Sequence, residues 1–367
     1  MQRIYNFSAE QSMLPREVLQ RAQQDIIEYG DSGMSVMELG PQSAEFCEIL
    51  HSCEALLRKL MNIPSNYKVM FLQGDPSAQY SAIPLNLLSE HKCADYIITG
   101  QSADAAFKEV RHRGDIVIAA TSSGANPPYS TVPMTGRSDF RPDADYVHIC
   151  YNDTVYGTKF NYIPDTGNIS IVADMSSSIL SEPIDVTKFA LIYAGAQHNL
   201  SIAGLTVVIA REDIVSGSAS DIPAVLDYKR LAEGSSKVST PPCYNVYIAK
   251  LTLEWLLENG GLEEMKRRNE RKASLIYDYI DGQTYYTSHV DKNCRSMTNI
   301  VFTTSKHALD TRFIEEARAN GLVNLEGDPS IGGMRASIYN AMPYDGVAKL
   351  VMFMKRFAIE NPKLLDF

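Results

Sequence analysis

Three polar residues that can act on an acidic substrate lie in or just after short apolar segments. Asp174 follows ISIVA, His198 follows YAGAQ, and Arg335 lies within GGMRAS. An imidazole changes charge near neutral pH and can act as a general base, and a guanidinium can bind a carboxylate through two parallel hydrogen bonds. One hypothesis is therefore catalysis without a cofactor, in which these three residues act on a small carboxylate compound.

Each of these residues also has a purely structural interpretation. Asp174 precedes a run of serines and can cap that turn by accepting backbone N–H groups, and the sequence does not separate this role from ligand binding. For Arg335 we favour an interior ion pair with Asp328 or Glu326. For His198 we favour packing within the core over catalysis.

Cysteine and histidine spacing indicates neither a metal site nor a disulfide framework. The six cysteines are scattered without a CxxC pair, and the seven histidines form neither HxxxH nor HExxH. We therefore expect no metal, reduced thiols and a cytoplasmic location.

Composition and charge describe an acidic globular chain. The 367 residues include 34 Lys+Arg and 44 Asp+Glu, which gives a net charge of −10, and 45% of them are apolar. An acidic balance disfavours binding to nucleic acid, which requires a basic face. No apolar run approaches the roughly 18–20 residues that cross a bilayer. We expect neither nucleic acid nor a membrane as a partner.

Strand-like and helix-like segments alternate through most of the chain. The apolar runs 94–100 and 115–121, for example, flank a segment with a helical period at 102–113. Parallel strands that are covered by helices on both faces are apolar throughout. The pattern predicts an α/β fold whose large, mostly parallel mixed sheet is flanked by helices.

The alternation of strand-like and helix-like segments ends near residue 243, where two long helical stretches lead into a smaller α+β unit. The length of the chain also favours two domains. We expect a large domain over residues 16–257 and a small domain formed by residues 1–15 and 258–367.

Several short segments in order resemble one family over nearly the whole chain. They include NFSA (6–9), ADMSSSILSEPIDV (173–186), YAGAQ (193–197), STPP (239–242) and GGMRASIYNAMP (332–343). The chain resembles the phosphoserine aminotransferase family, whose members are homodimeric fold-type I enzymes that use pyridoxal phosphate in serine biosynthesis. The resemblance implies the same fold and a homodimer.

Four retained groups match cofactor contacts of the family, and one matches a substrate contact. By this resemblance Asp174 is the partner of the pyridine nitrogen, Thr154 and Gln197 contact the cofactor, and Thr240 serves the site of the neighbouring subunit. Arg335 matches the arginine that binds the α-carboxylate of the amino acid.

Other positions differ from the family in ways that weaken the implied cofactor site. The family has a lysine where this chain has His198, and imidazole lacks the primary amine that a Schiff base requires. In the turn Gly74–Ser77, Pro76 has no N–H to donate, and Asp75 places a carboxylate where the family binds the cofactor phosphate, which leaves Ser77 as the expected contact. The ring-stacking tryptophan of the family is absent.

The positions that bind the substrate phosphate in the family have changed as well. The two loops that carry His-Arg pairs in the family read Gly40-Pro41-Gln42-Ser43 and Gly327-Asp328-Pro329-Ser330 here. A phosphate group would therefore lose charge-assisted hydrogen bonds at both loops.

These changes lead to one main expectation and two alternatives. The main expectation is a catalytically inactive pseudo-aminotransferase that has no cofactor, or that binds another small carboxylate ligand. One alternative is a dehydratase-like enzyme that holds pyridoxal or pyridoxamine phosphate weakly and without a covalent bond, with His198 as the base. The other is transamination between O-phospho-L-serine and 2-oxoglutarate, as the overall resemblance suggests.

Overall fold

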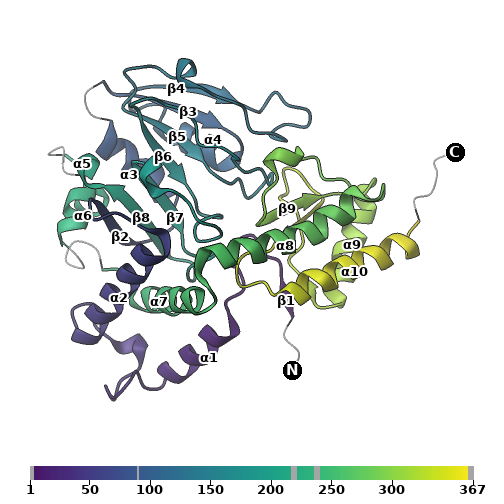
Figure 1. Ribbon diagram of the computed structural model, residues 1–367, viewed down its shortest axis with the longest axis horizontal. Helices are drawn as coiled ribbons and strands as arrows, with labels where there is room; N and C mark the ends of the chain where they lie inside the picture. Colours follow the sequence, from purple (N-terminus) through teal and green to yellow (C-terminus); the bar gives the residue numbers. More distant parts are fainter. Residues whose placement is uncertain (1–3, 89–90, 216–220, 235–239, 363–367) are drawn as a thin grey trace.

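The computed structural model describes residues 4–88, 91–215, 221–234 and 240–362. Its largest feature is a seven-stranded sheet in the order β2-β8-β7-β6-β5-β3-β4 (Figure 1). The strands are β2 (Tyr67–Gln73), β3 (Cys93–Ile98), β4 (Asp115–Thr121), β5 (Tyr146–Cys150), β6 (Ser170–Asp174), β7 (Leu191–Gly195) and β8 (Leu205–Arg211).

Five neighbouring strands of this sheet, from β7 to β4, run parallel, and β8 is antiparallel to both β7 and β2. Every residue of β3, β5 and β7 is buried, which is the pattern of strands covered on both faces. The expected α/β fold with a mostly parallel mixed sheet is confirmed.

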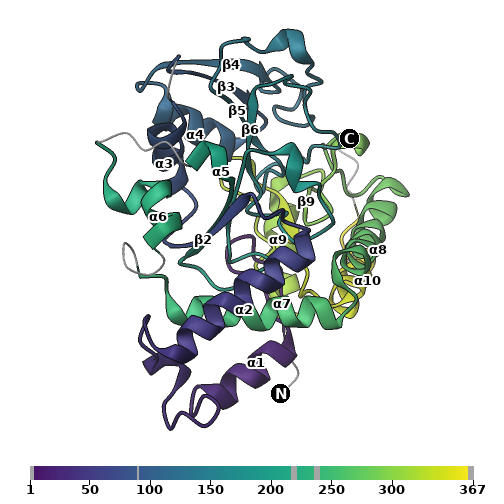
Figure 2. The ribbon, with the colours of Figure 1, turned by 60° about the vertical axis from the view of Figure 1, so that its left-hand side comes forward.

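Helices surround the sheet. They are α1 (Arg16–Asp25), α2 (Ala44–Met61), α3 (Ala78–Leu87), α4 (Gln101–Val110), α5 (Glu212–Val215), α6 (Tyr228–Gly234) and α7 (Cys243–Glu258). Helix α2 lies across α7 (Figure 2), and it begins where the Ser43 hydroxyl accepts the backbone N–H of Phe46 at 3.1 Å. Its buried face, which includes Phe46, Ile49 and Leu57, packs into the main core.

A second core lies outside the large sheet. It is built from α8 (Gly261–Asp281), α9 (His307–Ala319) and α10 (Tyr344–Glu360), with the antiparallel pair β9 (Asn299–Phe302) and β11 (Met334–Ser337). Strand β1 (Tyr5–Asn6) pairs with β10 (Leu322–Val323), and Phe7 and Met13 belong to this second core. The division into residues 16–257 and residues 1–15 with 258–367 remains a proposal, since Leu262 and Cys294 pack into the main core.

None of the helices among the described residues is both long and apolar enough to cross a membrane.

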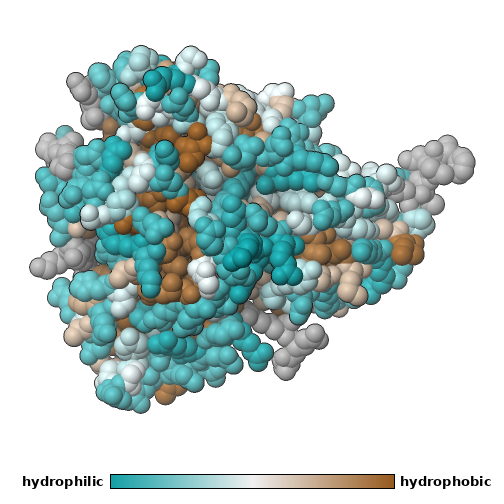
Figure 3. Space-filling view, in the orientation of Figure 1, coloured by the Kyte–Doolittle hydropathy of each residue, from teal (hydrophilic) through white to brown (hydrophobic). Residues whose placement is uncertain are grey.

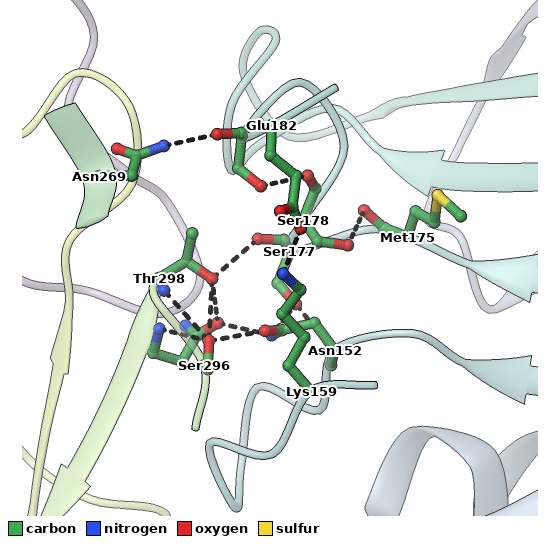
Figure 4. A network of polar contacts seen from close by, with 11 residues as sticks. Asn152, Lys159, Met175, Ser177, Ser178, Glu182, Asn269, Ser296 and Thr298 are labelled. Carbon is green, nitrogen blue, oxygen red and sulfur yellow. Dashed lines mark hydrogen bonds and ion pairs between the residues drawn. The ribbon is translucent and has the colours of Figure 1, made fainter. Parts of the chain in front are cut away.

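A buried polar network joins the ends of β5 and β6 to the second core (Figure 4). The amide of Asn152 donates to the Ser177 hydroxyl at 2.9 Å and accepts from the Ser296 hydroxyl at 2.6 Å. Thr298 donates to the carbonyl of Ser177 at 3.2 Å, and Lys159 forms an ion pair with Glu182 beside the same turn. Because Asn152, Ser177, Ser296 and Thr298 are buried and bonded to one another, they fix the relative position of the segments that carry the site described below.

We expect Asn152→Ala to lower the free energy of unfolding by about 1–3 kcal/mol, because it leaves buried hydroxyl and amide groups without partners. Urea denaturation measures the change. Asn168→Ala is the matched control, since Asn168 is exposed and we expect its loss to change the free energy of unfolding by less than about 0.5 kcal/mol. Equal effects of the two substitutions would contradict a structural role for the network.

Candidate functional site

Asp174 is the last residue of β6, and its side chain is 5% exposed. Its Oδ1 accepts the backbone N–H of Ser176 at 2.9 Å and the Ser176 hydroxyl at 2.6 Å. Burial raises the pKa of Asp174, although these hydrogen bonds oppose the shift. One carboxylate oxygen therefore caps the serine turn, as the structural interpretation expected, and a cation beside the carboxylate would stabilise its charged form.

His198 follows β7 and lies close to the same turn. Its Nδ1 lies 2.8 Å from the carbonyl oxygen of Ser176, so Nδ1 carries the proton in the neutral ring, because a carbonyl oxygen can only accept. Burial lowers the pKa of His198, whereas the carbonyls of Ser176 and Ala9 and the charge of Asp75 favour the protonated form. Burial is the largest influence and the charge of Arg335 adds to it, so the ring is neutral near pH 7.

Tyr339 connects His198 with the other site residues. Its ring stacks on the imidazole with the centroids 4.8 Å apart. Its hydroxyl accepts from Asn299 at 2.9 Å and donates to the carbonyl of Ala9 at 3.2 Å, and a hydrogen bond with Thr154 is among the influences that lower its pKa against the larger effect of burial. Sequence reasoning did not single out Tyr339, although it lies within the segment GGMRASIYNAMP.

Arg335, on β11, lies against the loop that follows β5. Its Nη1 is 3.4 Å from the carbonyl oxygen of Thr154. The expected ion pair with Asp328 or Glu326 does not form, because Glu326 binds Arg318 and the Asp328 carboxylate accepts from Ser330. Among the described residues, Arg335 forms no ion pair, so its charge is available to a carboxylate ligand.

The turn between β2 and α3 has the geometry that the sequence suggested. The Asp75 carboxylate accepts the backbone N–H of Ser77 at 2.9 Å, so that N–H group is already occupied. Gly195 lies against Pro76, and a Cβ on Gly195 would stand 2.6 Å from Oε1 of Gln197. The structure thus brings Ser77 and Gln197 to the same end of the site as Asp75.

Asp153 is a buried carboxylate that sequence reasoning missed. Its Oδ1 accepts the N–H groups of Val155 and Tyr156 at 3.0 and 2.8 Å, and burial raises its pKa to about 6. Gly100 packs so closely that a Cβ there would lie 2.1 Å from Oδ2. The only signal in the sequence was an acidic residue immediately before Thr154.

The raised pKa of Asp153 predicts a pH dependence of stability. The folded protein binds the proton of the Asp153 carboxyl more tightly than the unfolded chain does. Protonated Asp153 therefore contributes to the free energy of unfolding in full below about pH 4, and this contribution is lost as the pH rises through about 6. Between pH 4 and 7 we expect the free energy of unfolding to fall by about 2–3 kcal/mol less in Asp153→Asn than in the unaltered protein. Denaturation curves across that range test it, and identical slopes for the two proteins would show that Asp153 keeps an ordinary pKa.

One of the expected positions, Thr240, was not brought to this site. Thr240 is exposed at the start of the segment before α7, and its expected role concerns the site of a neighbouring subunit.

Comparison with known proteins places this site in a family. The model of the family "Aminotransferase class-V" matches residues 4–350. A phosphoserine aminotransferase from Bacillus cereus is 45% identical over 98% of this chain and 100% of its own length, and one from Nitrosomonas europaea is 46% identical over 97% and 99%. The chain belongs to the phosphoserine aminotransferase family.

Solved structures agree with this family assignment. A phosphoserine aminotransferase from Bacillus circulans subsp. alkalophilus superimposes with a TM-score of 0.94 at 41% identity, covering 98% of this chain and 99% of that one. The phosphoserine aminotransferase from Trichomonas vaginalis, whose structure has pyridoxal phosphate bound, gives a TM-score of 0.89 at 33% identity, covering 96% and 100%. The expected fold-type I architecture is confirmed.

These findings correct two expectations from the sequence. An inactive pseudo-aminotransferase and the absence of a cofactor were both expected, and both are contradicted by full-length identity to phosphoserine aminotransferases, including one solved with its cofactor. The error came from giving all weight to the altered positions. In the structure Arg335 and Thr154 lie beside Tyr339, which stacks on His198, and the serine turn that Asp174 caps also contacts His198.

The residues fit the ring end of pyridoxal phosphate better than its phosphate end. Asp174 is a buried carboxylate that a protonated pyridine nitrogen would stabilise. At the other end, Ser77 and Gln197 are present, but Asp75 faces the same region with a negative charge. The ring end therefore supplies the main fit, and position 198 offers no amine for a covalent bond.

Proposed function

We propose that this chain is a pyridoxal-phosphate-dependent aminotransferase that exchanges an amino group between an α-amino acid and an α-oxo acid. The pair suggested by its relatives is O-phospho-L-serine and 2-oxoglutarate, as in serine biosynthesis. The observation that carries the proposal is the 45% identity to a phosphoserine aminotransferase over 98% of the chain.

In this proposal Asp174 holds the ring nitrogen of the cofactor, Thr154 and Gln197 contact its ring and phosphate, and Ser77 contributes at the phosphate end. When bound, the cofactor supplies a carbonyl that takes up the amino group and a ring that withdraws electrons. Because residue 198 is a histidine, the protein binds the cofactor through these non-covalent contacts alone.

In this proposal His198 is the base that moves the proton of the substrate α-carbon. Its Nδ1–H is directed to the carbonyl of Ser176, which leaves Nε2 as the basic atom of the neutral ring. Tyr339 fixes the plane of the ring by stacking on it. Nε2 would take the proton from the α-carbon of the amino acid and deliver it to the carbonyl carbon that the bound cofactor supplies, and in the second half of the reaction it would deliver a proton to the α-carbon of the oxo acid.

Arg335 binds the α-carboxylate of the substrate, since it has no carboxylate partner among the described residues and its guanidinium can form two parallel hydrogen bonds. The other end of the substrate faces the loop that carries Asp328. Because that loop lacks a cation, we propose that the enzyme binds phosphoserine less tightly than its relatives do.

We also propose a homodimer in a cytoplasmic location. The family resemblance supports the dimer, and Figure 3 shows a strip of hydrophobic side chains on the left half of the face in view, over the domain that contains the sheet. The six free cysteines among the described residues support a reducing compartment.

A coupled assay with pyridoxal phosphate, glutamate and phosphohydroxypyruvate tests the proposal. We expect formation of 2-oxoglutarate that stops when the cofactor is dialysed away and resumes when it is restored. A panel of other α-oxo acids identifies the preferred acceptor. No cofactor-dependent product with any of them would refute the aminotransferase proposal.

A second candidate, a dehydratase-like reaction, is favoured by the histidine at position 198. In that case the base removes the α-proton, and the group on the β-carbon leaves. With phosphoserine this reaction releases inorganic phosphate and forms no 2-oxoglutarate from glutamate, so measuring both products in one assay separates the two reactions.

A further inference from the structure

A basic cleft lies on the side of the second core, away from the residues assigned above. It has a volume of about 700 Å³ and lies where the start of α1, the end of α7, the first half of α8 and the start of α10 meet. Arg16, Arg268, Arg271 and Lys272 line it, and Glu17 is the only carboxylate among its described lining residues. In a chain with a net charge of −10, such a cleft is a local region of positive potential.

Two arginines of the cleft are held in place, and only Arg271 lacks an ion pair among the described residues, since Arg268 pairs with Glu264 outside the cleft. The guanidinium of Arg271 lies over the ring of Tyr344, 5.2 Å from its centroid. Arg268 donates to Oδ1 of Asn259 at 3.0 Å and pairs with Glu264, which is shared with Arg267 and does not line the cleft. Figure 3 shows hydrophilic side chains gathered over α8 on this side of the molecule. The arginine planes are thus oriented in advance, which reduces the entropy lost when they bind an anion.

Lys272 contributes positive charge to the cleft, but none of its N–H groups is free to bind a ligand. Its Nζ donates to the carbonyls of Ile338, Tyr339 and Met342 at 3.0, 2.8 and 3.1 Å. Three acceptors match the three protons of an ammonium group. Burial, with the charge of Arg268, lowers the pKa of Lys272 to about 7. Below that pH a buried positive charge lies under the cleft, and an anion above it would be attracted without displacing a hydrogen bond.

The same segment links the cleft to the site. Residues 338–342 contribute carbonyls to Lys272 on one side, and on the other side Tyr339 stacks on His198. Asn340 lines the cleft and also a small adjoining hollow that His198 lines. The cleft and the hollow also share Met13, Pro15 and Trp255, so the two sites adjoin.

We propose that this cleft binds a small anion with two negative charges, either a dicarboxylate or a phosphate group. Arg16 and Arg271 donate hydrogen bonds directly to the anion, and Arg268 adds a third guanidinium. The positive charge of Lys272 attracts the anion from below the cleft. This binding does not depend on the proposed transamination, because none of these residues is assigned to the cofactor or the substrate.

Isothermal titration with succinate and with inorganic phosphate, each against chloride at equal ionic strength, tests the proposal. Arg16→Ala and Arg271→Gln should each weaken the binding of at least one probe by about 10- to 100-fold, the effect of losing a charge-assisted hydrogen bond. Arg267→Ala is the matched control, because Arg267 lies on the same helix, is 69% exposed and does not line the cleft. Succinate alone would define a carboxylate site, and phosphate alone a phosphate site.

The variant Arg335→Lys distinguishes anion binding in the cleft from anion binding at the proposed substrate site. Binding that survives this substitution and falls in the two cleft variants supports the proposal, whatever the transamination assay shows. The proposal is overturned if neither probe binds beyond the chloride reference, if binding falls only in Arg335→Lys, or if Arg267→Ala weakens it as much as the cleft variants do.

Discussion

His198→Asn should lower the turnover number of the cofactor-dependent reaction by about 10²- to 10⁴-fold, the usual contribution of a positioned general base. Asparagine can still donate to the carbonyl of Ser176, which His198 contacts at 2.8 Å, but it cannot take up a proton. The KM for the amino acid should change little, because Arg335 binds the carboxylate. Steady-state kinetics with saturating pyridoxal phosphate measures both parameters.

The pH profile distinguishes a base from a packing residue. Burial lowers the pKa of His198, so the neutral, active form is lost only on the acid side, and the rate should rise with pH through a value below the ordinary 6.5 of histidine. That acid limb should disappear in His198→Asn. His51→Asn, at an exposed position on α2, is the control, and an unchanged acid limb in His198→Asn would assign the base to another group.

Asp174→Asn should weaken the binding of pyridoxal phosphate by about 10²- to 10³-fold, because removing one partner of a buried charge pair costs several kcal/mol. The asparagine Oδ1 can still accept the backbone N–H of Ser176, so the turn should keep its shape. Fluorescence titration with the cofactor gives the dissociation constants.

The matched control for this substitution is Asp165→Asn. Asp165 also accepts a backbone N–H two residues ahead, that of Gly167 at 3.0 Å, but its side chain is 70% exposed. We expect its replacement to leave cofactor binding unchanged. If both variants bind the cofactor as the unaltered protein does, Asp174 is a turn cap and nothing more.

The fold was predictable because its signals are local. The run 191–195 is apolar and forms β7, and the run 94–98, which is apolar except for Asp95, forms most of β3. Every residue of both strands is buried. The antiparallel direction of β8 was not predicted, because an apolar run carries no information about the direction of its neighbours.

The site was predicted in part. Asp174, His198 and Arg335 were identified from their residue types, and the structure places all three near Tyr339 or the serine turn. Their partners could not be read from the sequence. The Ser176 carbonyl that orients His198 and the Tyr339 ring that stacks on it come from separate segments, 22 and 141 residues away along the chain.

The prediction of function was wrong for a related reason. Each altered position was assessed by itself, and every loss near the phosphate seemed to remove the cofactor. Binding energy is the sum of many contacts, however, and a charge pair at Asp174 can offset a poor contact at Asp75. Identity of 45% over the whole chain preserves the framework that holds those contacts together.

Equilibrium dialysis with pyridoxal phosphate, followed by borohydride reduction and intact-mass analysis, tests most directly whether the protein binds its cofactor without a covalent bond. We predict saturable binding of one cofactor per chain, complete release on further dialysis, and no added mass after reduction. In His198→Lys we predict added mass from one covalently retained cofactor. No saturable binding by the unaltered protein, or a cofactor retained covalently at another residue, would contradict the account.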